Sequence, residues 1–169
     1  MRRRATRTIL AVDDSRANLS ILAQRLGNLG YLVVLADSGT QALELISARG
    51  FDLVLLAKVM PELSGIHVLQ EVRSMRDTAD LPVIVLTEND ALGAVEALVA
   101  GADDYLVRPF DFEVLAARIG RVLARADRIE ELKRSNLALD ARIAARAIEL
   151  GELRTELAVA KAEHARLSA

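Results

Sequence analysis

Cysteine and tryptophan are both absent from the 169 residues, and aromatic side chains make up only 3% of them. Without cysteine the chain can form neither disulfides nor thiolate metal sites, which suits a reducing compartment such as the cytoplasm. The scarcity of aromatic residues leaves a core to Leu, Val, Ile and Ala. Because 52% of the chain is hydrophobic, these residues are numerous enough to build one.

Long apolar runs and a strong charge imbalance are also missing. No segment approaches the roughly 20 consecutive apolar residues that a bilayer-spanning helix needs. The basic start at residues 1–4 leads into Thr8–Val12, an apolar run too short for a secretory signal. A net charge of −2 argues against a general nucleic-acid or membrane surface. We therefore expect a soluble, cytoplasmic protein.

What is present is a regular alternation of strand and helix patterns joined by short connections. The expected strands are Thr8–Val12, Tyr31–Leu35, Asp52–Leu56, Pro82–Leu86 and Tyr105–Val107. The expected helices are Ala17–Leu29, Ala42–Ala48, Ile66–Met75, Ala91–Ala100 and one that begins near Asp111. This alternation predicts an α/β fold with a doubly wound parallel sheet. We expect the domain to cover residues 1–124.

Residues 125–169 contain no proline, and their apolar residues follow a seven-residue repeat. The expected a positions are Ile129, Asn136, Ile143, Leu150, Leu157 and His164. The expected d positions are Leu132, Leu139, Arg146, Leu153, Ala160 and Leu167. A narrow stripe sustained over this length predicts a coiled coil.

Charges beside the stripe favour a parallel pair of helices. In that arrangement Glu149 faces Arg154 of the second helix, and the next heptad repeats the attraction between an acid and a base. Asn136 at an a position is a common device for fixing a two-stranded parallel register. Arg146 and His164 weaken the seam locally, and the earlier pair of Arg128 with Lys133 is repulsive. We expect a parallel homodimer, and the alternative is one amphipathic helix folded back on the domain.

The third expected strand ends at a position of chemical interest. In an open α/β sheet, reactive groups lie just beyond the carboxyl ends of the strands. Here that position holds Ala57, whose methyl group can neither attack an electrophile nor bind a metal. The other motifs have to be interpreted around this missing group.

Four motifs stand in order at the ends of the expected strands. They are Asp13-Asp14 after the first, the Met-Pro-x-x-x-Gly loop of Met60–Gly65 after the third, Thr87 at the end of the fourth, and Asp-Tyr-Leu-Val-x-Pro-Phe over Asp104–Phe110. Together they resemble the receiver domain of two-component response regulators over the first roughly 120 residues. The resemblance implies a flavodoxin-like five-stranded sheet in the order 2-1-3-4-5.

In that family an aspartate ending the third strand accepts a phosphoryl group with the help of Mg²⁺. The resemblance gives Asp13 and Asp14 the role of metal-binding carboxylates, and the alternative is that they cap a helix. Ala57 occupies the acceptor position, so aspartyl phosphorylation is expected to be absent. Asp52 is no substitute because it begins the strand, and Lys58 replaces a residue that is commonly apolar. No cofactor is required, and any Mg²⁺ would bind weakly.

Arg108 stands where the family has a lysine that contacts the phosphoryl group. Arg keeps the charge but is a planar fork of donors, so the exchange is not neutral. Our hypothesis is that Arg108 pairs with Asp13 or Asp14 and fills the space left by the missing aspartate. The alternative is an arginine that faces solvent.

The remaining switch positions are also recognisable by resemblance. Thr87 matches the hydroxyl that moves towards the phosphoryl group in relatives, and Tyr105 matches the aromatic residue that changes rotamer with it. The alternative is that both are simply packed residues. The bond before Pro109 is usually cis in the family. Glu88 replaces a small residue and adds negative charge at the mouth of the site.

Two functions from different classes remain. The first is a dimerisation and signalling module without an enzymatic activity of its own, whose partner face includes Ala91–Gly101, Tyr105 and the helix from Asp111. Its partners would be a second copy and a histidine kinase or other signalling protein. The second is the regulatory front of a larger signalling enzyme, such as a histidine kinase, diguanylate cyclase or cyclic-di-GMP phosphodiesterase, with Ala57 as an engineered change. A nucleic-acid binder is disfavoured, since no basic recognition helix follows.

Overall fold

The computed structural model describes residues 6–88 and 91–169. Strands and helices alternate through the first part of the chain, as the sequence predicts. The strands are β1 (Thr8–Val12), β2 (Leu32–Ala36), β3 (Leu53–Ala57), β4 (Val83–Thr87) and β5 (Asp104–Val107). The helices are α1 (Arg16–Asn28), α2 (Gly39–Ala48), α3 (Gly65–Ser74), α4 (Ala91–Val99) and α5 (Phe112–Leu167).

The strands form a single parallel sheet in the order β2-β1-β3-β4-β5, which confirms the expected fold class. Every residue of β3 and β4 is buried, as their uninterrupted apolar sequences predict for inner strands. β2 lies at an edge and leaves Leu32 and Leu35 exposed. The sheet order therefore places the ends of β1, β3 and β4 next to one another at one edge.

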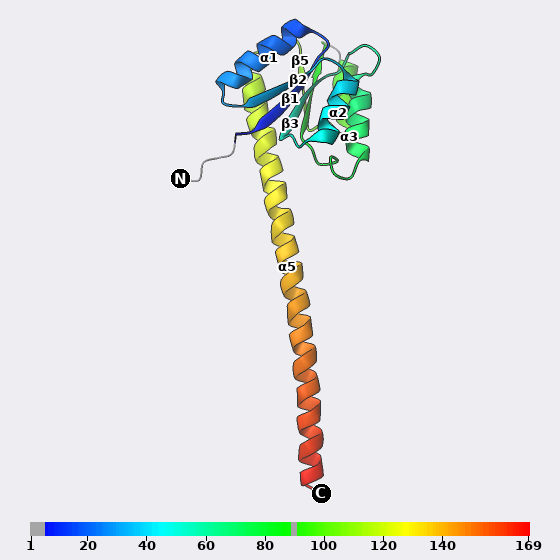
Figure 1. The fold of residues 1–169 in the computed structure, drawn as a ribbon, viewed down its shortest axis with the longest axis vertical. Coiled ribbons are helices and arrows are strands. Elements are labelled where there is room, and N and C mark those ends of the chain that lie inside the picture. The colour runs from blue at the N-terminus through cyan, green and yellow to red at the C-terminus, as the bar shows by residue number, and fades with distance from the viewer. Residues whose placement is uncertain (1–5, 89–90) are drawn as a thin grey trace. The chain divides into compact units, whose positions relative to one another are not determined.

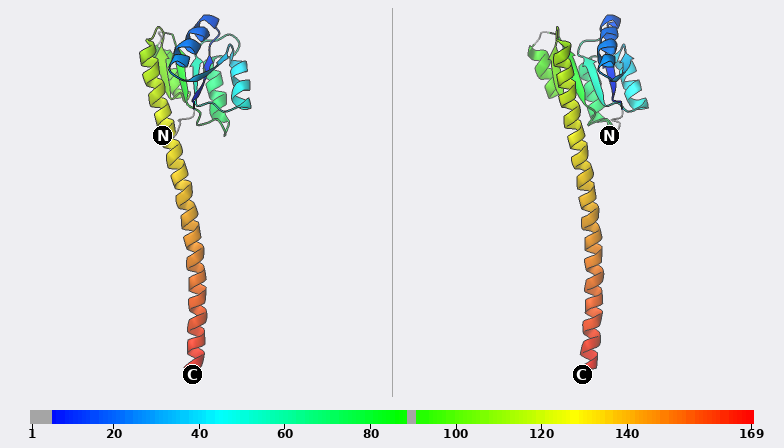
Figure 2. Two further views of the ribbon diagram at one scale, coloured as in Figure 1. Left: turned by 60° about the vertical axis from the view of Figure 1, so that its left-hand side comes forward. Right: turned by 90° about the vertical axis from the view of Figure 1, so that its left-hand side faces the viewer.

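Helices cover both faces of this sheet (Figures 1 and 2). One half of the core joins the sheet to α1 and to the first turns of α5, through side chains that include Leu26 and Ile119. The other half joins it to α2, α3 and α4, through Ile46, Leu69 and Ala97 among others. Alternate residues along each strand point into opposite halves, which is why the strands are apolar on both faces.

Local signals set where the helices begin and end. The hydroxyl of Ser15 accepts a hydrogen bond from the amide of Asn18 and caps α1. Ser38 caps α2 by accepting from the amide of Gln41, whose side chain in turn accepts from the amide of Asp37. In the usual capping box this side chain accepts from the amide of the capping residue itself, whereas here it accepts from the amide one residue earlier.

β3 is one residue longer at its carboxyl end than the sequence predicts. Ala57 pairs with Leu86 in the register between β3 and β4, so the strand includes the position that is missing a carboxylate. Asp52 lies before the strand, where it accepts from the amide of Thr8 and from Arg7. It is therefore at the opposite edge of the sheet from Ala57, as expected.

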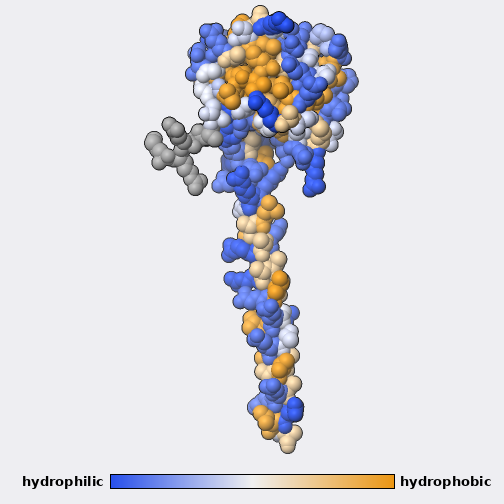
Figure 3. All heavy atoms as spheres, in the orientation of Figure 1, coloured by the Kyte–Doolittle hydropathy of each residue, from blue (hydrophilic) through white to orange (hydrophobic). Residues whose placement is uncertain are grey.

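The chain divides into two compact units, Met1–Ala126 and Asp127–Ala169. The second unit, here called the tail, is helical up to Leu167. Its large aliphatic side chains are exposed, and Figure 3 shows them interspersed with charged residues along the helix. Among the described residues, no helix combines the length and hydrophobicity needed to cross a membrane.

Gly65 is needed at the start of α3 because the backbone of the neighbouring strand passes directly against it. A Cβ atom at this position would collide with the carbonyl group of Ala57 and approach the Cα atom of Lys58 to 3.0 Å. The amide of Gly65 also donates to the carbonyl of Lys58 over 2.9 Å. The loop after β3 thus turns back tightly against the end of that strand.

We expect Gly65→Ala to lower the free energy of unfolding by about 1–3 kcal/mol, because rigid backbone cannot move aside as a side chain can. Calorimetric unfolding measures the effect. Gly120→Ala is the matched control: nothing lies within 4 Å of a Cβ atom there, in the helix α5. That change should leave stability unchanged or raise it by up to about 1 kcal/mol. Equal effects of the two substitutions would contradict the close approach at Gly65.

Candidate functional site

Asp13 follows β1 directly and is only 1% exposed. One carboxylate oxygen accepts from the amide of Ser15 over 2.8 Å, and the other accepts from the side-chain amide of Asn18 over 3.2 Å. A buried carboxylate needs such partners because it has lost its hydration. The turn from β1 into α1 supplies them from the first residues of the helix, so this carboxylate is held firmly in one place.

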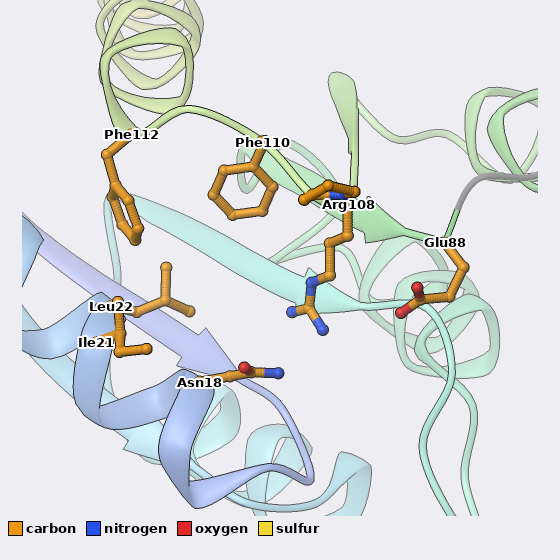
Figure 4. Close-up of a pocket in the computed structure, with 8 residues that line it drawn as sticks. Asn18, Ile21, Leu22, Glu88, Arg108, Phe110 and Phe112 are labelled. Atoms are coloured by element: carbon orange, nitrogen blue, oxygen red, sulfur yellow. The ribbon is translucent and has the colours of Figure 1, made fainter.

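Arg108 provides the charge that balances Asp13. Its guanidinium donates to a carboxylate oxygen of Asp13, and its side chain is 21% exposed. The amide of Arg108 donates to the carbonyl of Thr87, which fixes the arginine beside the end of β4. Figure 4 shows the side chain extending towards Asn18 on α1. The structure thus contains the pair that we hypothesised, and a solvent-facing arginine is excluded.

Ala57 is 3% exposed and lies at the same edge of the sheet, between the ends of β1 and β4. No carboxylate is available at this position to join Asp13. The next residue, Lys58, turns its ammonium group to Glu96 on α4, with 2.8 Å between the charged atoms. Two cationic side chains therefore flank the missing acceptor, and each is bound to an acid of the protein.

The other predicted site residues are distributed around this edge. Asp14 is exposed, and Ser15, not an aspartate, is the cap of α1. Thr87 is 1% exposed, and its hydroxyl has no hydrogen-bond partner in the part of the chain that the structure describes. Tyr105 is partly buried against the core on the side of α2, α3 and α4. The bond before Pro109 is cis, as predicted.

A pocket of about 400 Å³ opens beside the Arg108–Asp13 pair, between α1 and the segment that joins β5 to α5 (Figure 4). Its walls are mostly apolar and include Ile21 and Phe110, while Glu88 and Arg108 supply the charged part of the lining. Glu88 is exposed, so the negative charge expected at the mouth of the site is present there.

The donor set at this edge does not fit a magnesium ion well. Mg²⁺ is usually held by one or two carboxylates in a near-octahedral shell of oxygen atoms. Here Asp13 is bound to Arg108 and position 57 contributes a methyl group, which leaves Asp14 as the acid after β1 that could offer an oxygen ligand. The described residues contain no cluster of three or more His, Cys, Asp or Glu side chains suited to a metal.

The sheet order, the buried aspartate after β1 and the threonine and arginine beside it define a receiver-type domain. The chain belongs to the response regulator receiver domain family, whose model matches residues 9–120. Receiver domains of this family act in two-component signalling, where they interact with other signalling proteins, and they are generally not enzymes. This confirms the resemblance drawn from the motifs.

Known proteins agree with this assignment. The chain is 46% identical over 118 residues to the response regulator MprA of Mycobacterium leprae, covering 69% of this chain and 51% of that protein. It thus spans about half the length of such relatives. Two solved structures match as well. CheY4, a chemotaxis protein of Vibrio cholerae, has a TM-score of 0.66 at 31% identity, over 70% of this chain and 99% of that one.

The second is the receiver domain of the sensor histidine kinase PA1611 of Pseudomonas aeruginosa. It has a TM-score of 0.67 at 32% identity and covers 71% of this chain and 99% of that one. In that structure a magnesium ion is coordinated in the active-site cleft.

Some residues of the site were not found from the sequence. Asn18 holds Asp13, and Phe112 packs edge to face beside the pocket against Phe110, the last residue of the fourth motif, with 5.7 Å between ring centres. The position of Asn18, five residues after Asp13 on the first turn of the helix, was the available signal. Nothing in the sequence pairs Lys58 with Glu96, which lie far apart in the chain.

We expect Arg108→Ala to lower the free energy of unfolding by about 3 kcal/mol, because it leaves the buried charge of Asp13 without its counterion. Thermal unfolding in the presence of a metal chelator measures this loss. Arg108→Lys should retain part of the stability. Arg134→Ala removes an exposed ion pair of the tail and should change stability by less than about 0.5 kcal/mol. An unchanged melting temperature for Arg108→Ala would contradict the role given to the pair.

Proposed function

We propose that this chain is a receiver module that cannot accept phosphate on aspartate and that signals in one fixed state. The observation that carries the proposal is Ala57, buried at the end of β3, where the family has its acceptor. Of the described acids named above, Asp13 is bound to Arg108 and Asp52 is at the opposite edge of the sheet, so neither takes its place.

The surroundings of Ala57 support the same proposal. In the family the site holds a cluster of acidic side chains, and Mg²⁺ offsets their negative charge and that of the incoming phosphoryl group. Here Arg108 already balances Asp13, so the site needs no metal for its own stability. We propose that the module works without a cofactor.

We further propose that the tail pairs with a second copy as a parallel coiled coil. Its a and d side chains are largely exposed, with Leu150 at 55% and Leu153 at 53%, so the seam is open to a partner helix. Burying such a stripe against a second helix is the main source of stability in coiled coils. The acid and base pairs that flank the later heptads, Glu149 with Arg154 among them, favour a parallel match.

The proposed module would hold two receiver domains together and present their surfaces to a signalling partner such as a histidine kinase. The alternative, in which the chain is the front of a larger signalling enzyme, is not favoured by the family match over residues 9–120.

The unaltered chain, incubated with a small phosphodonor and Mg²⁺, should form no acyl phosphate, since position 57 has no oxygen nucleophile. Intact-protein mass spectrometry with hydroxylamine treatment detects such a phosphate. Ala57→Asp is the matched variant, because it supplies an acceptor carboxylate. The double variant Ala57→Asp with Arg108→Lys, in which Asp13 is released from the arginine, should take up phosphate more readily than Ala57→Asp alone. Hydroxylamine-labile phosphate on the unaltered chain, at the rate of an active receiver, would refute the proposal.

Sedimentation should find the full chain as a dimer, and Leu150→Lys should shift it to monomer because a charge enters the seam. Ile148→Lys is the matched control, since Ile148 is 65% exposed and lies outside the a and d positions. That variant should remain a dimer. A monomeric parent chain, or equal loss of dimer in both variants, would show that this seam does not pair the tail.

A further inference from the structure

Helix α4 is attached to the sheet in an unusual way. The residues that it buries are small: Gly93, Ala94 and Ala97. Its larger aliphatic side chains are exposed instead: Leu92, Val95, Leu98 and Val99. Since apolar stabilisation scales with the area removed from water, contacts made through Gly and Ala hold a helix less firmly than contacts through Leu or Val. Polar attachments therefore matter more for α4 than for the other helices.

Lys58 supplies such an attachment, and hydrogen bonds hold its main chain in place. Its amide donates to the carbonyl of Leu86 on β4 over 2.9 Å, and its carbonyl accepts from the amide of Gly65 over 2.9 Å. The main chain of Lys58 is thus held by β4 on one side and by the start of α3 on the other. Its side chain therefore starts from a backbone position that these two hydrogen bonds hold in place.

The side chain of Lys58 reaches α4. The ammonium group of Lys58 lies 2.8 Å from a carboxylate oxygen of Glu96, and the lysine side chain is only 17% exposed. Glu96 is the one charged residue in the sequence of α4. Burial of the lysine reduces screening by solvent on its side of the pair, while Glu96 is 55% exposed, so the pair lies between a surface pair and a buried one.

We propose that Lys58 is a positioning residue that fixes α4 to the end of β3, one residue beyond the missing acceptor. The ion pair links the site edge to α4 by an interaction that needs no phosphoryl group and no metal. It holds the exposed aliphatic face of α4 in one orientation, which gives a structural basis for a receiver with one fixed state. This inference adds to the proposed function but does not require that the tail pairs.

Hydrogen exchange of the full chain, followed by mass spectrometry, tests this role. Lys58→Met removes the charge and keeps most of the aliphatic stem. Amides of residues 91–101 should then exchange about threefold to tenfold faster, while those of α1 keep the rates of the parent chain. Glu96→Gln, on the exposed side of the pair, should give the same local change. The double exchange Lys58→Glu with Glu96→Lys should restore slow exchange at α4.

The control is Glu130→Gln, which breaks an exposed ion pair to Arg134 in the tail. It should leave exchange at α4 unchanged. Two results would overturn the inference. One is exchange at α4 within twofold of the parent in both single variants. The other is an equal acceleration at α1 and α4, which would show that Lys58 supports the whole fold and does not position α4. Phosphate uptake by the unaltered chain would disprove the proposed function, but it would not change how these two hydrogen-exchange results are interpreted.

Discussion

The buried charge of Asp13 is the constraint on which the site depends. A carboxylate that is 1% exposed needs polar and charged partners in place of the water that it has lost. Ser15 and Asn18 satisfy its oxygen atoms, and Arg108 balances its charge. Because Ala57 adds no second buried acid, one arginine is enough. Retention of the aspartate and loss of the acceptor are therefore compatible in a stable fold.

Side-chain attachments hold the elements of the domain together at both edges of the sheet. Arg108 ties the end of β5 to the end of β1, and Lys58 ties the end of β3 to α4. At the opposite edge of the sheet, Arg73 on α3 donates to the carbonyl of Gly101 and to the carboxylate of Asp103 just before β5. Each link joins elements that are distant in sequence. The domain thus has the fold of the receiver family, while Arg108 and Asp13 at its site are bound to each other.

The frame could be predicted from the sequence because it depends on local patterns. The apolar run before Ala57 and the glycine at residue 65 determine an inner strand and its tight exit, whatever the rest of the chain does. The pair between Arg108 and Asp13 could also be predicted, because both residues belong to motifs whose positions at strand ends are known. The pair between Lys58 and Glu96 could not be. Long flexible side chains can reach several acids, and only the folded backbone decides which one lies near.

Binding of Mg²⁺ to the unaltered chain tests the central claim most directly, because the metal and Arg108 compete for the same carboxylate of Asp13. Calorimetric titration with Mg²⁺ should find no saturable binding to the unaltered chain at millimolar concentrations, and binding should emerge when Ala57→Asp is combined with Arg108→Lys. Saturable binding to the unaltered chain, as tight as to that double variant, would contradict the claim that the protein's own arginine already neutralises the site.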